Sequence, residues 1–229
     1  MTLTIRDVQV ATPRARIVHL DLDGQAFPYA AGQAVAVAVP GERRRLYSIA
    51  SAPEDARREG YLELLVGIDA EGRAGPHLPL EAGTAVDVEG PLGTFTFPEQ
   101  PEEHQFVFVA GGTGIAPLRA MLRHALATRQ ARRVGVLYSA RTPEDFAYER
   151  ELRALAAAGV IELRQTVTRA LETDWAGNRG RIDQAALATL VSDDRALCFV
   201  CGPAAMVDDI PRLLSGMGVP RERIRIEEW

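Results

Sequence analysis

The hydrophobic and polar positions follow different patterns in the two halves of the chain. Up to about residue 100, the apolar residues form short alternating runs: TLTIRDVQVA, RARIVHLDL, GQAVAVAVP, RLYSIAS, GYLELLVGI and TAVDVEGP. Turn residues such as Pro28, Gly32, Gly72 and Gly83 separate these runs. Short, regularly spaced strands with turn signals and almost no helical periodicity predict an antiparallel barrel or sandwich.

The second half alternates continuous apolar runs with helical stretches. Strands are expected in QFVFVAG, RVGVLYSA, VIELRQTV, ALCFVCG and RIRIEEW. Helices are expected over about 115–130, up to about 158, over 183–191 and, despite Pro211, in MVDDIPRLLSGMG. Apolar strands that alternate with helices predict a parallel sheet covered on both faces.

The acidic segment PEQPEEH, at Pro98–His104, contains two prolines and is typical of a linker. A chain of 229 residues can form two compact domains, each of about 100–130 residues. We therefore expect an N-terminal antiparallel β-barrel domain over residues 1–99. A C-terminal α/β domain with a parallel sheet is expected over residues 104–229.

Composition and charge exclude several classes of function. The 26 basic residues stand against 31 acidic ones, for a net charge of −5, which argues against nucleic-acid binding. All basic residues are arginine, so a Schiff-base lysine and a Walker-type P-loop are excluded. No apolar run approaches the roughly 18 residues of a membrane span. The start, MTLTIRDVQV, resembles a strand rather than a signal peptide, so a cytoplasmic location is expected.

The cysteines and histidines do not predict a metal or redox site. Cys198 and Cys201 fall in the apolar run ALCFVCG, which we interpret as a buried strand. Residues i and i+3 of a strand lie about 10 Å apart on opposite faces, whereas a disulfide needs Cα atoms within about 7 Å. The histidines are scattered without the spacing of metal ligands. We therefore expect neither a redox dithiol nor a metal.

A glycine-rich turn follows the first strand of the second half. In AGGTGIAPL, Gly111, Gly112 and Gly114 allow a sharp turn, and Pro117 lies near the first turn of the next helix. Free N–H groups and the helix dipole at such a turn face an anion such as a pyrophosphate. The turn therefore predicts a dinucleotide-binding loop.

Later strands of this half also end in residues suited to a nucleotide. The second strand ends in SART, the third in TVTR and the fourth in CGPAAM. Arg141, in SART, and Arg169, in TVTR, suit a 2′-phosphate, because the second strand does not end in an acid that would select a free ribose hydroxyl. Each feature alone is more often an ordinary turn or a solvated side chain. Together at one sheet edge, they favour a dinucleotide site.

Four segments together resemble the ferredoxin–NADP reductase family, in order and spacing. They are RLYSIAS at Arg45–Ser51, GPLGTF at Gly90–Phe95, GGTGIAP at Gly111–Pro117 and CGPAAM at Cys201–Met206. The resemblance covers essentially the whole chain. It implies a flavin-binding barrel and an NAD(P)-binding domain, with hydride passing from nicotinamide to flavin N5 in the cleft between them.

The resemblance implies roles for residues of the first half. Arg45 would pair with the flavin phosphates, Tyr47 would pack on the isoalloxazine and ribityl, and Ser48 would be a neutral donor near N5. Leu46, in the same motif, would also bind the cofactor. A second strand and a second phosphate loop would complete the site, with Leu64, Leu65, Val66, Gly72, Arg73, Ala74 and Gly75. Gly75 replaces the family's Ser or Thr, so one hydroxyl hydrogen bond is missing; the resemblance still favours FAD over FMN.

It also implies roles near the nicotinamide. Cys201 would lie beside C4, Glu227 would be the active-site glutamate, and Trp229 would stack on the flavin face. Glu227 could instead be an exposed acid on an edge strand, and Trp229 could pack elsewhere. The other nucleotide-binding residues implied are Gly112, Thr113, Gly114, Pro117, Gly202, Pro203 and Met206.

The leading hypothesis is a flavoprotein that transfers hydride between NAD(P)H and bound FAD, with a preference for NADP(H). It would exchange single electrons with a separate carrier such as ferredoxin or flavodoxin, because flavin converts two-electron into one-electron chemistry. The alternatives are the reductase component of an oxygenase, a free-flavin reductase and a non-autonomous electron-transfer subunit. The sequence leaves these alternatives open.

Overall fold

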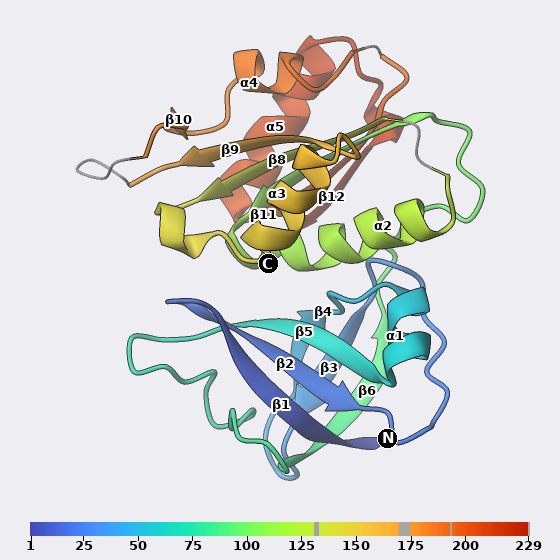
Figure 1. Ribbon diagram of the computed structural model, residues 1–229, viewed down its shortest axis with the longest axis vertical. Helices are drawn as coiled ribbons and strands as arrows, with labels where there is room; N and C mark the ends of the chain where they lie inside the picture. The colour runs from blue at the N-terminus through green and yellow to red at the C-terminus, as the bar shows by residue number, and fades with distance from the viewer. Residues whose placement is uncertain (131–132, 170–174, 193, 229) are drawn as a thin grey trace. The chain divides into compact units, whose positions relative to one another are not determined.

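The computed structural model describes residues 1–130, 133–169, 175–192 and 194–228. The chain forms two compact units (Figure 1). The first unit comprises Met1–Phe97 and Arg119–Thr128, and the second comprises Pro98–Leu118 and Arg129–Trp229. The division falls within helix α2 (Ile115–Ala127), whose first residues belong to the second unit.

The first unit is built on six antiparallel strands in the order β4-β3-β6-β1-β2-β5. The strands are β1 (Thr2–Thr12), β2 (Ala15–Asp21), β3 (Ala34–Ala38), β4 (Arg45–Ser48), β5 (Tyr61–Gly67) and β6 (Ala85–Leu92). A bridge between Ile49 and Leu64 joins the end of β4 to β5, which are the two edges of the sheet. The sheet therefore closes on itself, and the predicted antiparallel barrel is confirmed.

Alternation of side chains places the core inside this barrel. In β1, Leu3 and Ile5 are buried while Thr2 and Thr4 are exposed, as expected for a strand with one face on the core. The unit also contains helix α1 (Pro53–Glu59), which the sequence analysis missed. Proline at its first position and Gly60 in the left-handed conformation at its end are ordinary helix signals.

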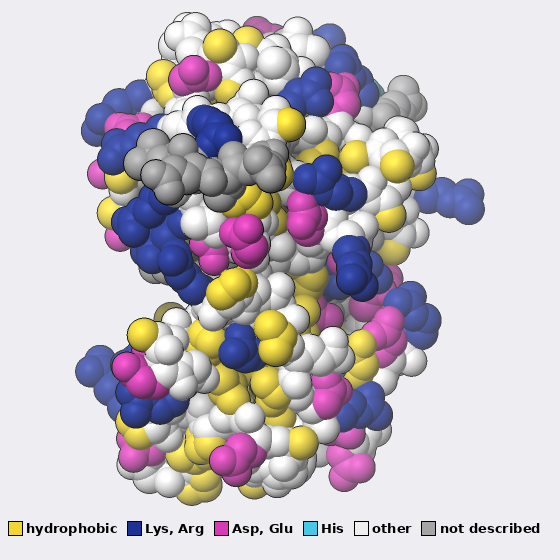
Figure 2. Space-filling view, turned by 60° about the vertical axis from the view of Figure 1, so that its left-hand side comes forward, with side chains coloured by type: hydrophobic (Ala, Val, Ile, Leu, Met, Phe, Trp, Pro, Cys, Tyr) yellow, Lys and Arg dark blue, Asp and Glu magenta, His cyan; other side chains and the backbone are white. Residues whose placement is uncertain are grey.

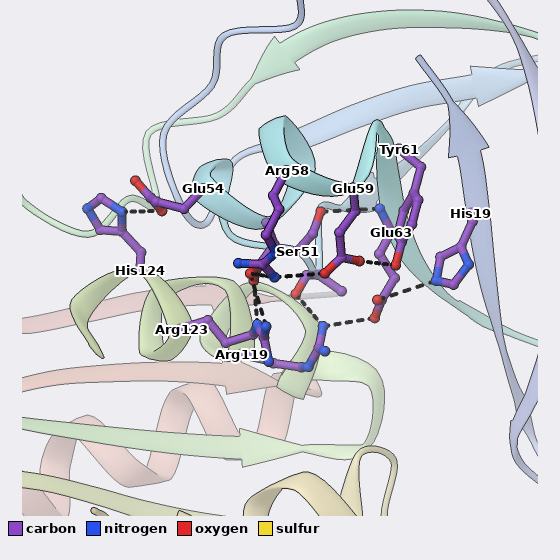
Figure 3. Close-up of polar contacts among 12 residues, drawn as sticks. His19, Ser51, Glu54, Arg58, Glu59, Tyr61, Glu63, Arg119, Arg123 and His124 are labelled. Carbon is purple, nitrogen blue, oxygen red and sulfur yellow. Dashed lines mark hydrogen bonds and ion pairs between the residues drawn. The ribbon is translucent and has the colours of Figure 1, made fainter. Parts of the chain in front are cut away.

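Ion pairs bind residues 119–128 of helix α2 to the rest of the first unit (Figure 3). Arg119 Nη1 donates to Glu63 Oε1 at 2.8 Å and to the carbonyl oxygen of Ala50 at 2.9 Å. Arg123 pairs with Asp55, which also accepts from Arg58. Both Arg119 and Glu63 are buried, so this contact is part of the interior.

The second unit is built on a parallel six-stranded sheet in the order β10-β9-β8-β7-β11-β12. Its strands are β7 (Gln105–Gly111), β8 (Arg133–Ala140), β9 (Glu162–Val167), β10 (Asn178–Arg179), β11 (Leu197–Gly202) and β12 (Ile224–Glu228). The predicted parallel sheet is confirmed. The two-residue β10 was not expected.

Besides the start of α2, the second unit contains helices α3 (Glu149–Ala157), α4 (Gln184–Ala188) and α5 (Ala204–Gly216) and three short 3₁₀ turns, Gly112–Gly114, Pro143–Asp145 and Arg221–Arg223. Helix α5 continues through Pro211, as predicted. Because parallel crossovers are right-handed and the strand order reverses at β7, α3 covers one face while α4 and α5 cover the other. None of the described helices is long and apolar enough to cross a membrane.

Candidate functional site

A pocket of about 550 Å³ lies at the carboxyl ends of the parallel strands in the second unit. The strand order reverses between β7 and β11, and ligands of open α/β sheets bind at this switch. The turns that follow these two strands contribute Gly111, Gly112, Pro203 and Met206 to the lining. Gly112, Pro203 and Met206 are among the residues that the sequence predicts for nucleotide binding.

Close backbone approach explains Gly114 of the first turn. A Cβ atom at Gly114 would lie 2.3 Å from the carbonyl oxygen of Cys201. Glycine at position 114 therefore allows the first turn to lie against the end of β11. Thr113, Gly114 and Pro117 continue the first turn into α2, and Gly202 precedes the second; these four lie outside the pocket lining.

Tyr138 contacts the turn that begins at Gly112, and the sequence did not predict this residue at the site. Its buried hydroxyl donates to the carbonyl oxygen of Gly112 at 3.0 Å and accepts from the N–H of Ala147 at 3.2 Å. Burial raises the pKa of Tyr138, so the hydroxyl stays protonated and can donate. In the sequence this tyrosine is only another apolar residue of a strand.

Three arginines line the pocket: Arg141, Arg169 and Arg181. The N–H of Arg169 donates to the carbonyl oxygen of Arg141 at 2.8 Å, so the predicted pair lies side by side. All three side chains are exposed, and none forms an ion pair with another residue of the described chain. Figure 2, which brings this edge of the sheet forward, shows basic side chains gathered on the second unit.

Arg181 was not expected at the site. It follows β10, a strand too short to leave a periodic pattern in the sequence. Asp209, from α5, is the one acidic residue of the pocket among the described residues, and its nearest basic partner is Arg212 at 3.8 Å. The pocket thus presents an excess of positive charge, which suits a ligand with several phosphates.

Cys201 and Glu227 lie opposite each other on β11 and β12. The Cys201 thiol donates to Glu227 Oε2 at 4.0 Å. Burial and the nearby Glu227 raise the pKa of Cys201, so its sulfur is a neutral thiol rather than a nucleophilic thiolate. Glu227 is half-buried on the edge strand β12. Trp229 lies outside the described residues.

The flavin-type motif of the first unit occupies the edge strand β4. Arg45 and Leu46 are exposed, and Tyr47 and Ser48 are half-buried. Arg45 has no carboxylate partner in the part of the chain that is described. The Ile49–Leu64 bridge brings this strand to β5, where the side chains of Leu64, Leu65 and Val66 are buried. At these three residues of β5, only backbone atoms are therefore available to contact a ligand.

The loop Gly72–Leu78 is linked to β4 by one side-chain contact. Tyr47 and His77 approach to 2.6 Å between the hydroxyl oxygen and Nε2, and their rings are nearly parallel. Gly72 and Gly75 have positive φ angles of 81° and 111°. Arg73 is already paired with Asp69 and Glu71, whereas Arg45 has no carboxylate partner within the described residues. Glycine turns and an uncompensated arginine fit the phosphates of a flavin nucleotide.

Comparisons with known proteins agree with this reading. Residues 2–97 match the family model of the oxidoreductase FAD-binding domain, and residues 108–212 match that of the oxidoreductase NAD-binding domain. Ferredoxin–NADP reductase B of Sorangium cellulosum is 38% identical over 221 residues, which cover 90% of this chain and 88% of that protein. The ferredoxin–NAD(+) reductase component of the Xanthobacter autotrophicus alkene monooxygenase system is 32% identical, covering 94% and 66%.

Solved structures show the same fold. An Amycolatopsis cytochrome P450 reductase is 28% identical with a TM-score of 0.84, covering 100% of this chain and 69% of its own. A ferredoxin NADP+ reductase from Neisseria gonorrhoeae with bound FAD and NADP has a TM-score of 0.83 at 21% identity, covering 100% and 98%. Motifs, fold and relatives together place the chain in the ferredoxin–NADP reductase family, as an oxidoreductase with FAD-binding and NAD(P)-binding domains.

Proposed function

We propose that the protein transfers hydride between NADPH and bound FAD and exchanges single electrons with a separate carrier of the ferredoxin or flavodoxin type. The observation that carries this proposal is the pocket at the strand switch, with its three arginines free of ion pairs within the described chain. The relative named ferredoxin–NADP reductase supports it. The flavin, when bound, supplies the conversion between two-electron and one-electron chemistry.

In the first unit, the residues of β4 would hold the flavin. Arg45, which has no carboxylate partner within the described residues, would bind its phosphates. Burial raises the pKa of Tyr47, so its ring packs as a neutral phenol. Ser48 would present a neutral hydroxyl donor where negative charge develops. The backbone of Leu64–Val66 would line the other side of the ring.

In the second unit, the turn at Gly112–Gly114 would bind the pyrophosphate through its N–H groups, with Tyr138 fixing the Gly112 carbonyl on the opposite side. Arg141, Arg169 and Arg181 would bind the 2′-phosphate of NADPH. A charge-assisted hydrogen bond contributes about 1.5–3 kcal/mol. NADH has no such phosphate, so we propose a preference for NADPH.

Cys201 and Glu227 would orient the nicotinamide rather than react with it. The thiol keeps its proton on Sγ because burial and the facing carboxylate disfavour the thiolate. Together the two side chains would exclude water from the reacting atoms. By the family resemblance, Trp229, which lies outside the described residues, would stack on the flavin.

A visible spectrum of the purified protein tests the proposal, followed by anaerobic titration with NADPH and with NADH. We expect a yellow protein that releases FAD on denaturation and is reduced at lower concentrations of NADPH than of NADH. Steady-state reduction of an added ferredoxin or flavodoxin would complete the test. A protein that binds neither FAD nor FMN would overturn the proposal.

A second candidate is the reductase component of an oxygenase. The supporting observation is similarity to the reductase component of the Rhodococcus jostii propane 2-monooxygenase, 29% identical over 98% of this chain and 64% of that protein. This function predicts NADH as the better donor and electron transfer to an oxygenase component. Rapid reduction of free FMN without any carrier protein would instead support a free-flavin reductase.

A further inference from the structure

His77 lies where the chain departs from the family pattern in the second phosphate loop. A Cβ atom at Gly75 would lie only 3.1 Å from His77 Nδ1 and 3.2 Å from Cε1. Gly75 also has a φ of 111°, which other residues rarely adopt. The imidazole therefore occupies the space in which the hydroxyl side chain of a Ser or Thr at position 75 would begin.

The hydroxyl of Tyr47 contacts one of the two ring nitrogens of His77. Burial raises the pKa of the Tyr47 hydroxyl, so this group is protonated and can donate to His77 Nε2 across 2.6 Å. Burial and the charge of Arg45 lower the pKa of His77, against the opposing charge of Glu42. A neutral imidazole has a single N–H. When Nε2 accepts from Tyr47, that proton lies on Nδ1, the atom nearest Gly75.

His77 Nδ1 has no hydrogen-bond partner among the residues that the structure describes, so in the tautomer that accepts from Tyr47 its N–H is available to a ligand. The His77 side chain is buried between β4 and its own loop, and the carbonyl oxygen of His77 accepts from the N–H of Val39 at 2.8 Å, which fixes the backbone. The imidazole is thus held at Nε2 and at the backbone, and a donor remains at Nδ1. The positive charge of Arg45 on β4 lowers the pKa of the same imidazole ring.

We propose that His77 Nδ1–H replaces the absent hydroxyl at position 75 and donates to a phosphate oxygen of the bound flavin, with Tyr47 fixing the tautomer. This inference rests on the proposed function, because it requires a flavin in the first unit. The neutral imidazole would donate one directional hydrogen bond to the phosphate, while Arg45 would supply the positive charge. Tyr47 and His77 therefore act as one unit that joins the flavin strand to the phosphate loop.

Three substitutions separate the two nitrogens of the ring. His77→Asn keeps a donor near the position of Nδ1, His77→Gln keeps a polar group near Nε2, and His77→Phe keeps only the packing. The dissociation constant for FAD is measured on each apoprotein by quenching of flavin fluorescence. We expect His77→Phe and His77→Gln to bind FAD about 10–100-fold more weakly, and His77→Asn to recover most of the loss.

Equal FAD affinity in His77→Phe and the wild type would overturn the inference, and so would recovery by Gln but not by Asn. Because a variant could fail to fold, the tautomer of His77 is also measured in the wild type by ¹⁵N NMR with FAD bound. Protonation at Nδ1 supports the inference, and protonation at Nε2 alone overturns it. A wild-type apoprotein that binds no flavin would defeat the proposed function itself, which is a distinguishable result.

Discussion

Arg119 of the first unit and the pocket arginines of the second unit have opposite surroundings. In the first unit, Arg119 is buried and bonded to Glu63 and to the carbonyl oxygen of Ala50. Glu63 in turn faces His19 (Figure 3). The other ring nitrogen of His19 lies 3.0 Å from Asp7 Oδ2. In the second unit, the arginines of the pocket are exposed and form no ion pair with the described residues.

This difference distinguishes an arginine that stabilises the fold from arginines that are available to bind an anion. A buried ion pair cannot lose one partner without leaving an uncompensated charge in a medium of low dielectric. An exposed arginine is solvated by water until an anion arrives, so it contributes little to folding. We therefore expect substitutions in the first group to change stability and those in the second to change nucleotide affinity.

The largest expected effect follows removal of one partner of the buried pair. Arg119→Met should lower the free energy of unfolding by about 3–5 kcal/mol, because the buried Glu63 would lose the guanidinium and keep the more distant contact with His19 at 3.4 Å. Urea unfolding followed by circular dichroism measures this change. The matched control is Arg73→Met, which breaks exposed pairs with Asp69 and Glu71 and should change stability by less than about 0.5 kcal/mol.

Similar losses of unfolding free energy in the two variants would show that the buried network stabilises the fold no more than an exposed ion pair does. A double substitution of Arg119 and Glu63 to apolar residues sharpens the point. It should recover part of the loss, because neither charge then remains unpaired. Nucleotide affinity is not the readout here, since the network lies within the first unit.

Substitutions of the pocket arginines should weaken nucleotide binding and leave stability almost unchanged. Arg181→Ala should weaken NADPH by about 10–100-fold, for a lost contact of about 1.5–3 kcal/mol. Stability should change by less than about 0.5 kcal/mol. Isothermal titration with NADP+ and NAD+ measures both affinities, and Arg221→Ala, an exposed arginine of the same unit outside the pocket, is the control.

An equal loss for both nucleotides would assign Arg181 to the pyrophosphate instead of the 2′-phosphate. The same measurement on Arg141→Ala and Arg169→Ala ranks the three arginines. If none of them affects NADP+ binding more than Arg221→Ala does, the charge excess of the pocket has no role in selectivity.

The same comparison explains what the sequence could predict. The apolar runs of β7, β8 and β11 are local patterns, because β7 and β11 are buried along their whole length and β8 is buried at every position after Arg133. The glycine turn that begins at Gly112, which has a φ of 54°, is local as well. Arg141 and Arg169 were found because they directly follow predicted strands.

Contacts between distant residues could not be predicted in this way. Arg119 and Glu63 are 56 positions apart, and Tyr47 and His77 are 30 apart. A single sequence contains no signal that joins such partners. Arg181 was missed because β10 has only two residues. Helix α1 could have been found, since its proline, acidic first turn and terminal glycine are all local.

A smaller effect is expected at Tyr138, which connects stability and binding. Tyr138→Phe removes the hydrogen bonds to Gly112 and Ala147 and should cost about 1 kcal/mol of stability. It should also weaken both nucleotides to the same extent if, as proposed, the turn binds the pyrophosphate that NADP+ and NAD+ share. A selective loss of NADP+ would contradict this assignment. The measurement is the pair of titrations used for Arg181.

The smallest effect is expected from pH, through His19. Burial opposes protonation of this imidazole, but hydrogen bonds to Glu63 and Asp7 outweigh it and raise the pKa above the ordinary 6.5. The ring of Tyr61, from β5, packs against the imidazole at a tilt of 32°, with 4.1 Å between the ring centroids, and the guanidinium of Arg6 lies over the Tyr61 ring. Protonated His19 donates to both carboxylates, whereas the neutral form has one N–H and serves only one.

The sign of the pH dependence follows from linkage. Because the pKa in the folded protein exceeds that in the unfolded chain, the stabilisation is fully present below pH 6.5 and is lost as pH rises through the folded pKa. Urea midpoints of the wild type and His19→Gln should therefore converge above that pKa. A difference that stays constant from below pH 6.5 to the alkaline side would show that His19 contributes by packing alone. In that case the electrostatic stabilisation of this network would come from Arg119 and Glu63 and not from the charge of His19.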